Sequence, residues 1–428
     1  MTCRLRPTLA RGFTLIELLV SLTGGLFVSL AVFALSRDAS RFYQREGRLA
    51  NATLAAVSGF ERLRADIARA GFLATPNVQA DPLVCTRPDN NATPLLRNLA
   101  SVHVVKGGSP TTAATTANAA QGFVADGLWL AGSYSSADEF PIRTVDALGG
   151  GAGYQVTLQT NSGAMARLGW NAADSTARGP LLASLFAPGR GLRIRDKQGD
   201  QHYGVIQSAQ VDGSGLPLIT LGAVPALTFR QGQTRLCGFQ GNETGAQAAV
   251  VNFIKYDLRN LSDASVYPAY AELYRTSSNS AIQAYESNRT ELVRRELDAA
   301  ASDSETELAV GGVNQVELVA EYAVGFRLDL TAITANPDLS NPAVAFVSRD
   351  DGAFDSFADV PSAATPQRIR ALRVRLAVRS REPDREANTV AGGYRIGLSV
   401  GGGSSGPFAR VRTLQADVML NNNSNAAW

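Results

Sequence analysis

The chain has 428 residues, of which 45% are hydrophobic and 18% charged, and its net charge is +2. This length can bury a substantial core, as one large domain or two smaller ones. The nearly balanced charge gives no sign of a nucleic-acid-binding surface. Only two histidines occur, His103 and His202, which argues against a histidine-based triad or a multi-histidine metal site. Glycine is abundant (40 residues), which favours a loop-rich, largely β fold outside the cytoplasm.

The first predicted element is an apolar helix at residues 13–35, FTLIELLVSLTGGLFVSLAVFAL. Its 23 residues would span about 34 Å, enough to cross a bilayer, and Glu17 is its only charge. A charge at the centre of a membrane helix costs about 2.5–3.5 kcal/mol, so Glu17 needs a partner. Cleavage after Gly12 would free the amine of Phe13, four positions away on the same face. That amine could pair with Glu17 of a neighbouring helix and set the register between subunits.

The run RGFTLIE (residues 11–17) resembles the processing site of type IV prepilins and of the pseudopilins of type II secretion. In that family a membrane aspartic peptidase cuts after the glycine and methylates the new N-terminal phenylalanine. The corresponding residues in this sequence are Gly12 and Phe13. The family's glutamate, here Glu17, guides subunit docking. The resemblance implies a leader at residues 1–12, a helix in the bacterial inner membrane and a periplasmic head. The alternative is an uncleaved signal anchor.

Helical periodicity continues through residues 36–72, and the whole helix would run about 85 Å. Gly71 is expected to follow its last turn as C′. The arginines at 37, 41, 45 and 48 fall on roughly one face, either solvated or paired with neighbouring subunits. One predicted buried stripe has steps of four and three and comprises Leu49, Thr53, Ala56, Phe60, Leu63, Ile67 and Ala70.

The end of this helix, FERLRADIARAGF (residues 60–72), resembles the corresponding segment of PilW-type minor pilins. The matching residues are Asp66, Ile67, Ala70, Gly71 and Phe72. In that pattern a cysteine follows, and here Cys85 arrives later than the family usually has it. The resemblance implies an α+β fold in which a long N-terminal pilin helix, half membrane-spanning and half amphipathic, packs on a large, mainly antiparallel β head.

Three cysteines are present: Cys3, Cys85 and Cys237. Loss of the leader would remove Cys3 and leave an even pair, which could form a disulfide in an oxidising periplasm. A loop of about 150 residues closed in this way would stabilise the fold by at most about 5 kcal/mol. The alternative is that Cys85 and Cys237 are buried free thiols.

After Phe72 the pattern becomes strand-like, which predicts a β-rich head at residues 73–428. The clearest strand is RALRVRLAVRS (residues 370–380), with Leu372, Val374, Leu376 and Val378 on a buried face and arginines on an exposed one. The run 316–330 followed by 370–380 is also PilW-like. Residues 73–250 are not placed by any motif. The other predicted strands lie at 122–132, 154–160, 202–211, 251–258, 270–276, 316–330 and 411–420.

Several head segments are predicted to be loops. The low-complexity run at 107–122 reads as a mobile loop, and the glycine-rich runs at 149–153 and 401–406 as loops without phosphate-binding character. Asp303, Glu305 and Glu307 read as a solvated turn. The acidic run 349–359 could supply Asp350, Asp351, Asp355 and Asp359 to calcium, but its spacing does not match an EF-hand, so a solvated loop is favoured.

These features favour a structural subunit over an enzyme, with no cofactor and no metal. The resemblance implies a minor pilin that initiates type IV pilus assembly in a tip complex. Its implied partners are other minor and major pilins, prepilin peptidase, the inner-membrane assembly machinery and inner-membrane lipid. One alternative is a type II secretion pseudopilin, although the large minor members of that family are usually shorter. Another is a tip adhesin or DNA-uptake receptor that uses the strand arginines Arg373, Arg375 and Arg379.

Overall fold

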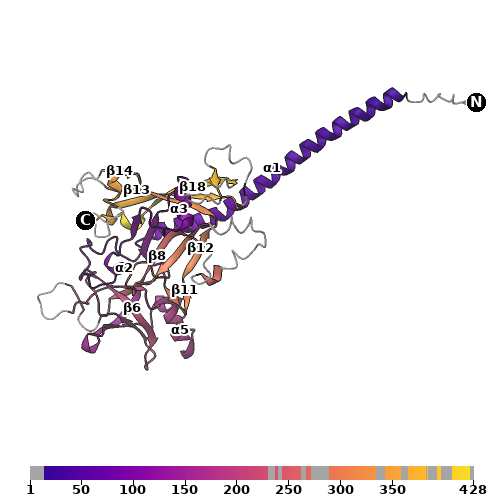
Figure 1. Cartoon of the computed structure of the whole chain (residues 1–428). Coiled ribbons are helices and arrows are strands. Elements are labelled where there is room, and N and C mark those ends of the chain that lie inside the picture. The colour runs from indigo at the N-terminus through magenta and orange to yellow at the C-terminus, as the bar shows by residue number, and fades with distance from the viewer. Residues whose placement is uncertain are drawn as a thin grey trace, which may run out of the picture. The chain divides into compact units, whose positions relative to one another are not determined.

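The computed structural model describes residues 14–229, 237–239, 243–261, 267–270, 289–333, 343–357, 365–381, 383, 393–396 and 407–424. It shows an α+β protein with a long N-terminal helix and many antiparallel strands (Figure 1). The chain divides into two units, Met1–Asn51 and Ala52–Trp428. We call the second the head unit; it contains the predicted head and the last part of the helix α1 (Leu15–Arg69).

In the first unit, α1 is apolar and exposed. The segment Leu15–Ser40 has a mean hydropathy of 2.3 over its most apolar stretch, none of which is buried. It is the one helix in the described part of the chain that is long and apolar enough to cross a membrane. An added Cβ at Gly24 or Gly25 would meet no atom within 4 Å. The unit is therefore compatible with a single-pass membrane anchor.

In the head unit, the rest of α1 buries one stripe of side chains. Ala56, Phe60, Leu63 and Ile67 are all at most 5% exposed, as their spacing predicts. Burial from Ala56 onward also explains why the chain divides inside the helix and not at its end. Leu49, at the start of the predicted stripe, lies outside the described side chains. The helix ends at Arg69.

The end of α1 follows from its glycine. Gly71 adopts φ 75°, the left-handed conformation typical of a C′ residue. Its amide donates to the carbonyl of Ala131 at 2.8 Å, so the chain leaves the helix against a strand. The predicted stop at this glycine is confirmed.

Gly59 marks a close approach between α1 and β12 (Val316–Ala320). A Cβ at this position would lie 1.8 Å from the carbonyl oxygen of Val319. We expect Gly59→Ala to destabilise the head unit by about 1–3 kcal/mol, because the backbone must shift, although alanine favours helix by about 1 kcal/mol. Denaturant unfolding of the full chain in detergent micelles measures the change. Gly47→Ala is the matched control, since its Cβ would meet nothing within 4 Å; equal effects at both positions would contradict the prediction.

The described strands of the head unit form two main antiparallel sheets and two small hairpins. The four-stranded sheet has the order β14-β13-β15-β18, and Figure 1 shows β13, β14 and β18 together at one end of the head unit, away from β6 and α5. Its strands are β13 (Ala323–Ile333), β14 (Val344–Val347), β15 (Ile369–Arg379) and β18 (Val411–Met419). The hairpins pair β10 (Ala309–Val310) with β11 (Val313–Asn314) and β16 (Tyr394–Arg395) with β17 (Phe408–Ala409).

The ten-stranded sheet follows the path β1-β2-β8-β3-β4-β7-β6-β5, with β9 beside β8 and β12 beside β9. The buried stripe of α1 shares one hydrophobic core with this sheet and with the four-stranded one. The strands not yet given bounds are β1 (Val102–Val105), β2 (Gly127–Gly132), β3 (Phe140–Ala147), β4 (Tyr154–Leu158), β5 (Gly191–Arg195), β6 (Gln201–Val211), β7 (Pro217–Leu221), β8 (Gln247–Arg259) and β9 (Glu291–Leu297).

Part of this sheet closes on itself. Strands β3, β4, β7, β6 and β5 pair in that order, and β8 pairs with both β3 and β5. The result is an antiparallel barrel filled by its own cluster of apolar side chains, to which helix α5 (Ser175–Leu185) adds Leu182 and Leu185. The barrel occupies much of the stretch that no motif placed. Residues fully buried in it include Ile142, Val156, Leu192, Ile206 and Ile219.

The structure corrects two sequence predictions. The segment 107–122 is not a mobile loop, since it contains helix α3 (Ala113–Ala119), whose N-terminus is closed by a capping box between Thr112 and Thr115. The predicted single strand 316–330 is two strands, β12 and β13, in different sheets. Tyr322, at φ 55°, makes the turn between them.

The remaining described helices are short. They include α2 (Pro94–Arg97), α4 (Gly163–Arg167) and the 3-10 turns η1 (Gly149–Gly151), η3 (Gly352–Phe354), η4 (Pro366–Arg368) and η6 (Asn421–Asn423). The predicted strand at 122–132 is reduced to β2, and η1 falls within the predicted glycine-rich loop. Residues 271–276 of the predicted strand 270–276, and the predicted loop 401–406, lie outside the described residues.

Candidate functional site

Glu17 has a hydrogen-bonding partner at the first turn of its own helix. Its Oε2 accepts from the backbone amide of Thr14 at 3.0 Å and from the Thr14 hydroxyl at 2.9 Å. The Glu17 amide in turn donates to Thr14 Oγ1 at 3.3 Å. This reciprocal pattern is a capping box, which the sequence predictions missed although its signature, T-x-x-E, is present at residues 14–17.

The capping box bears on which group compensates the charge of Glu17 in the apolar helix. The carboxylate lies at the end of the apolar helix, where it satisfies backbone groups that a helix start leaves open. A local partner therefore exists without a neighbouring subunit. Gly12 and Phe13, the predicted cleavage and methylation residues, lie outside the described residues. Pairing of Glu17 with the Phe13 amine of a neighbour stays a prediction.

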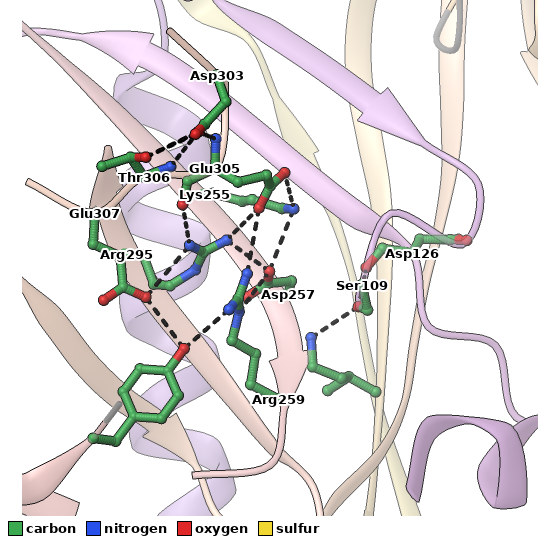
Figure 2. Close-up of polar contacts among 12 residues, drawn as sticks. Ser109, Asp126, Lys255, Asp257, Arg259, Arg295, Asp303, Glu305, Thr306 and Glu307 are labelled. Carbon is green, nitrogen blue, oxygen red and sulfur yellow. Dashed lines mark hydrogen bonds and ion pairs between the residues drawn. The ribbon is translucent and has the colours of Figure 1, made fainter. Parts of the chain in front are cut away.

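A buried charge network lies on the face of β8 turned away from α1. Lys255, Asp257 and Arg295 are each at most 1% exposed. The Asp257 carboxylate contacts Arg295 Nη2 at 2.9 Å, Arg259 Nε at 3.0 Å and Lys255 Nζ at 3.4 Å. Figure 2 shows these side chains converging from two neighbouring strands, β8 and β9. A carboxylate so deeply buried is tolerated because cations surround it.

The segment predicted to be a solvated turn is largely exposed, as expected, but two of its acids, Glu305 and Glu307, also pair with this network. Glu305 accepts from Lys255 Nζ at 2.7 Å and from Arg295 Nη2 at 2.9 Å. Glu307 contacts Arg295 Nη1 at 3.4 Å and accepts from the Tyr267 hydroxyl at 3.2 Å. Asp303 is exposed, as predicted, and caps the turn through the amides of Glu305 and Thr306 (Figure 2).

Charges in the network balance three against three. Lys255, Arg259 and Arg295 face Asp257, Glu305 and Glu307. Burial raises the pKa of Asp257, but Arg295, Arg259 and Lys255 lower that pKa by more, so it lies below its ordinary value. The arrangement is therefore suited to fasten the 301–307 segment to the sheet, with each charge matched.

An aromatic stack borders the network. Lys255 Nζ lies 4.0 Å from the centre of the Trp129 ring, which packs on His103 with ring centres 5.6 Å apart. The Nε2 atom of His103 is buried and has no hydrogen-bond partner among the described residues. Burial, and the positive charge of Lys255, lower the pKa of His103 to about 4.

This shift predicts a pH dependence of stability. Below pH 6.5 the unfolded chain takes up a proton at His103 that the folded chain does not take up until about pH 4. The head unit should therefore lose stability as the pH falls from 6.5 to 4, by at most about 3 kcal/mol and less because the ring is partly exposed. Unfolding curves of the full chain across this range, compared with His103→Gln, measure the effect. An equal slope in both proteins would refute it.

A second polar cluster fastens α1 to the sheet. Asp66, 5% exposed, accepts from Arg294 Nε at 2.6 Å and from the Tyr256 hydroxyl at 2.8 Å. The Tyr134 hydroxyl donates to the backbone carbonyl of Asp66 at 3.0 Å. Asp66, which carries part of the PilW resemblance, thus joins the end of α1 to β8 and β9.

The strand arginines do not form the exposed basic face that was predicted. Arg373 pairs with Asp417 at 2.7 Å, and Arg375 contacts Asp329 Oδ2 at 3.4 Å. Arg379 is only 2% exposed and lies over the rings of Tyr322 and Tyr394. The reason is that β18 supplies an acid opposite Arg373, and the end of β15 is covered on both faces.

The described part of the acidic run, residues 349–357, is held by ion pairs. Asp350 pairs with Arg327 at 2.9 Å and Asp355 with Lys106 at 2.6 Å, while Arg349 reaches the buried Asp126. Asp351 caps η3 through the amide of Ala353, and Asp359 lies outside the described residues. Among the residues that the structure describes, no group of three or more His, Cys, Asp or Glu side chains could hold a metal ion.

Cys85 and Cys237 form a disulfide across 152 residues, with Cα atoms 5.9 Å apart, as the cysteine count predicts. Local contacts place both partners. The Cys85 amide donates to the carbonyl of Gln201 at 3.0 Å, and the amide of Gly238 donates to Asp196 Oδ2 at 3.3 Å. The bridge joins two loops, one bonded to the start of β6 and the other to the β5–β6 turn.

In comparisons with known proteins, no family model, no curated protein and no solved structure matches this chain.

Proposed function

We propose that this protein is a PilW-type minor pilin, which takes part in the initiation of type IV pilus assembly within a tip complex. The supporting observation is the start of α1: directly after the RGF run, Glu17 closes the first turn of an apolar helix whose side chains are exposed. A helix of this kind needs either lipid or other helices around it. Its partners would be other minor and major pilins, prepilin peptidase and the inner-membrane assembly machinery.

In this proposal the head unit lies in the periplasm before assembly and on the cell surface afterwards. A pseudopilin of type II secretion would share the same N-terminal features. The paired arginines of β15 give no support to a DNA-uptake receptor.

Mass spectrometry of the mature N-terminus tests the processing class. Cells with active prepilin peptidase should yield a chain that begins with N-methylated Phe13, and cells without the peptidase the full leader. A leader that persists with the peptidase active would overturn the proposal. Deletion of the gene then separates the alternatives: loss of surface pili supports assembly, and intact pili with lost adhesion support a receptor.

Glu17→Ala should leave leader removal largely intact yet block incorporation into pili, because docking loses its carboxylate. Immunoblots of sheared pili measure incorporation. Thr14→Ala is the control, since it removes the side-chain cap at a cost of about 1 kcal/mol but keeps the carboxylate. Normal incorporation of Glu17→Ala would refute the docking role. An equal loss of incorporation in Glu17→Ala and Thr14→Ala would show that Glu17 acts only as a helix cap.

A further inference from the structure

Two charged positions bound the apolar part of α1 at a spacing that matches a bilayer. Glu17 lies at the first turn, and the next charges are Arg37 and Asp38. The 19 uncharged residues between Glu17 and Arg37 span about 28 Å as a helix, close to the hydrocarbon thickness of about 30 Å. The capping box and the Arg37 side chain would then lie at opposite interfaces.

Two hydroxyl side chains inside this interval bond to carbonyls of their own helix. The Ser21 hydroxyl donates to the carbonyl of Leu18 at 3.0 Å, and the Thr23 hydroxyl donates to the carbonyl of Leu19 at 2.9 Å. Side chains that bond their own helix can face hydrocarbon without an unmet donor. Ser21 and Thr23 can therefore lie in lipid.

An exposed aromatic pair follows this interval. Phe42 is 58% exposed and Tyr43 75%, and their rings meet edge to face with centres 6.1 Å apart. Both residues lie about 9–10 Å beyond Ser36 along the helix axis. Helical side chains tilt towards the N-terminus, here towards the bilayer, which brings both rings back to the headgroup layer.

We propose that Phe42 and Tyr43 form an interfacial anchor that inserts into the lipid headgroup layer and sets the depth of α1 in the membrane. The lipid interface is the occupant that the position favours, because amphipathic rings gather there and Arg37 precedes them on the same boundary. Tyr43 offers a hydroxyl to the headgroups and Phe42 an apolar ring to the acyl boundary. The inference rests on the apolar helix and not on the proposed pilin function.

Depth-dependent quenching tests the position of the pair. The full chain, reconstituted in phosphatidylethanolamine–phosphatidylglycerol vesicles, carries Tyr43→Trp or, as a reference for the bilayer centre, Phe27→Trp. Signals are taken as differences from the parent chain, which contains three tryptophans. Lipid spin-labelled on the headgroup should quench Tyr43→Trp most, and lipid brominated in mid-chain should quench Phe27→Trp most. A Tyr43→Trp signal that neither lipid quenches would overturn the proposal and indicate a protein partner.

A second measurement tests anchoring itself. In the Phe27→Trp background, Phe42→Ala with Tyr43→Ala should change the ratio of mid-chain to headgroup quenching. The exchange Phe42→Tyr with Tyr43→Phe, which keeps both rings, should preserve that ratio. An unchanged ratio in the double-alanine variant would show that the pair does not set the depth, and the proposal would fail.

Discussion

Replacing Asp257 by alanine is expected to destabilise the head unit by about 3–5 kcal/mol, the cost of removing one partner from a buried ion pair. Asp257 is fully buried, and its loss leaves Lys255 and Arg295 with only the partly exposed Glu305 and with Glu307 to balance them. Urea unfolding of the full chain in detergent micelles measures the change. Asp146→Ala, an exposed aspartate on β3, is the control and should stay within about 0.5 kcal/mol of the parent.

The lowered pKa of Asp257 gives this prediction a second readout. A carboxyl whose folded pKa lies below its unfolded value stabilises the fold above the unfolded pKa, near 4. That contribution is lost as the pH falls through the lower, folded value. The difference in stability between the parent and Asp257→Asn should therefore shrink as the pH is lowered below about 4. A difference that stays constant down to pH 2 would show that the carboxylate charge is not what stabilises the network.

Removing the disulfide is expected to have an effect of similar size. The double variant Cys85→Ser, Cys237→Ser frees a loop of 152 residues, for which chain entropy gives at most about 5 kcal/mol. The loop contains β1 through β7, so most of the barrel would be tethered only by its own pairing. The midpoint of denaturant unfolding should fall for the double variant. Reduction of the parent chain should lower it equally, and Cys3→Ser should leave it unchanged.

Local patterns predicted the elements that depend on neighbours in sequence. The helix stop at Gly71, the stripe from Ala56 to Ile67 and the alternation in β15 all follow from spacing within one segment. Such patterns act over one or two turns or along one strand, so the sequence carries them directly. The capping box of Thr14 and Glu17 is equally local, but it was not among these predictions.

Features that depend on distant partners were not predictable in the same way. Lys255 and Asp257 alternate with apolar residues in β8, which reads as a solvated strand face. They are buried because the 301–307 segment, about 50 residues further along, covers them. The alternation in β15 likewise predicts an exposed Arg379, but the rings of Tyr322, in the β12–β13 turn, and Tyr394, in β16, cover it. Barrel closure likewise requires β8 to meet β3 and β5.

Strand β8, which has 13 residues, belongs both to the barrel and to the part of the ten-stranded sheet that contacts α1. Its first residues close the barrel, and Tyr256, further along the strand, donates its hydroxyl to Asp66 at the end of α1. A shift in the register of β8 within the barrel would therefore also displace Tyr256 from Asp66. Mechanical load applied to the barrel would therefore reach the end of α1 along the backbone of β8 and across the Tyr256–Asp66 hydrogen bond.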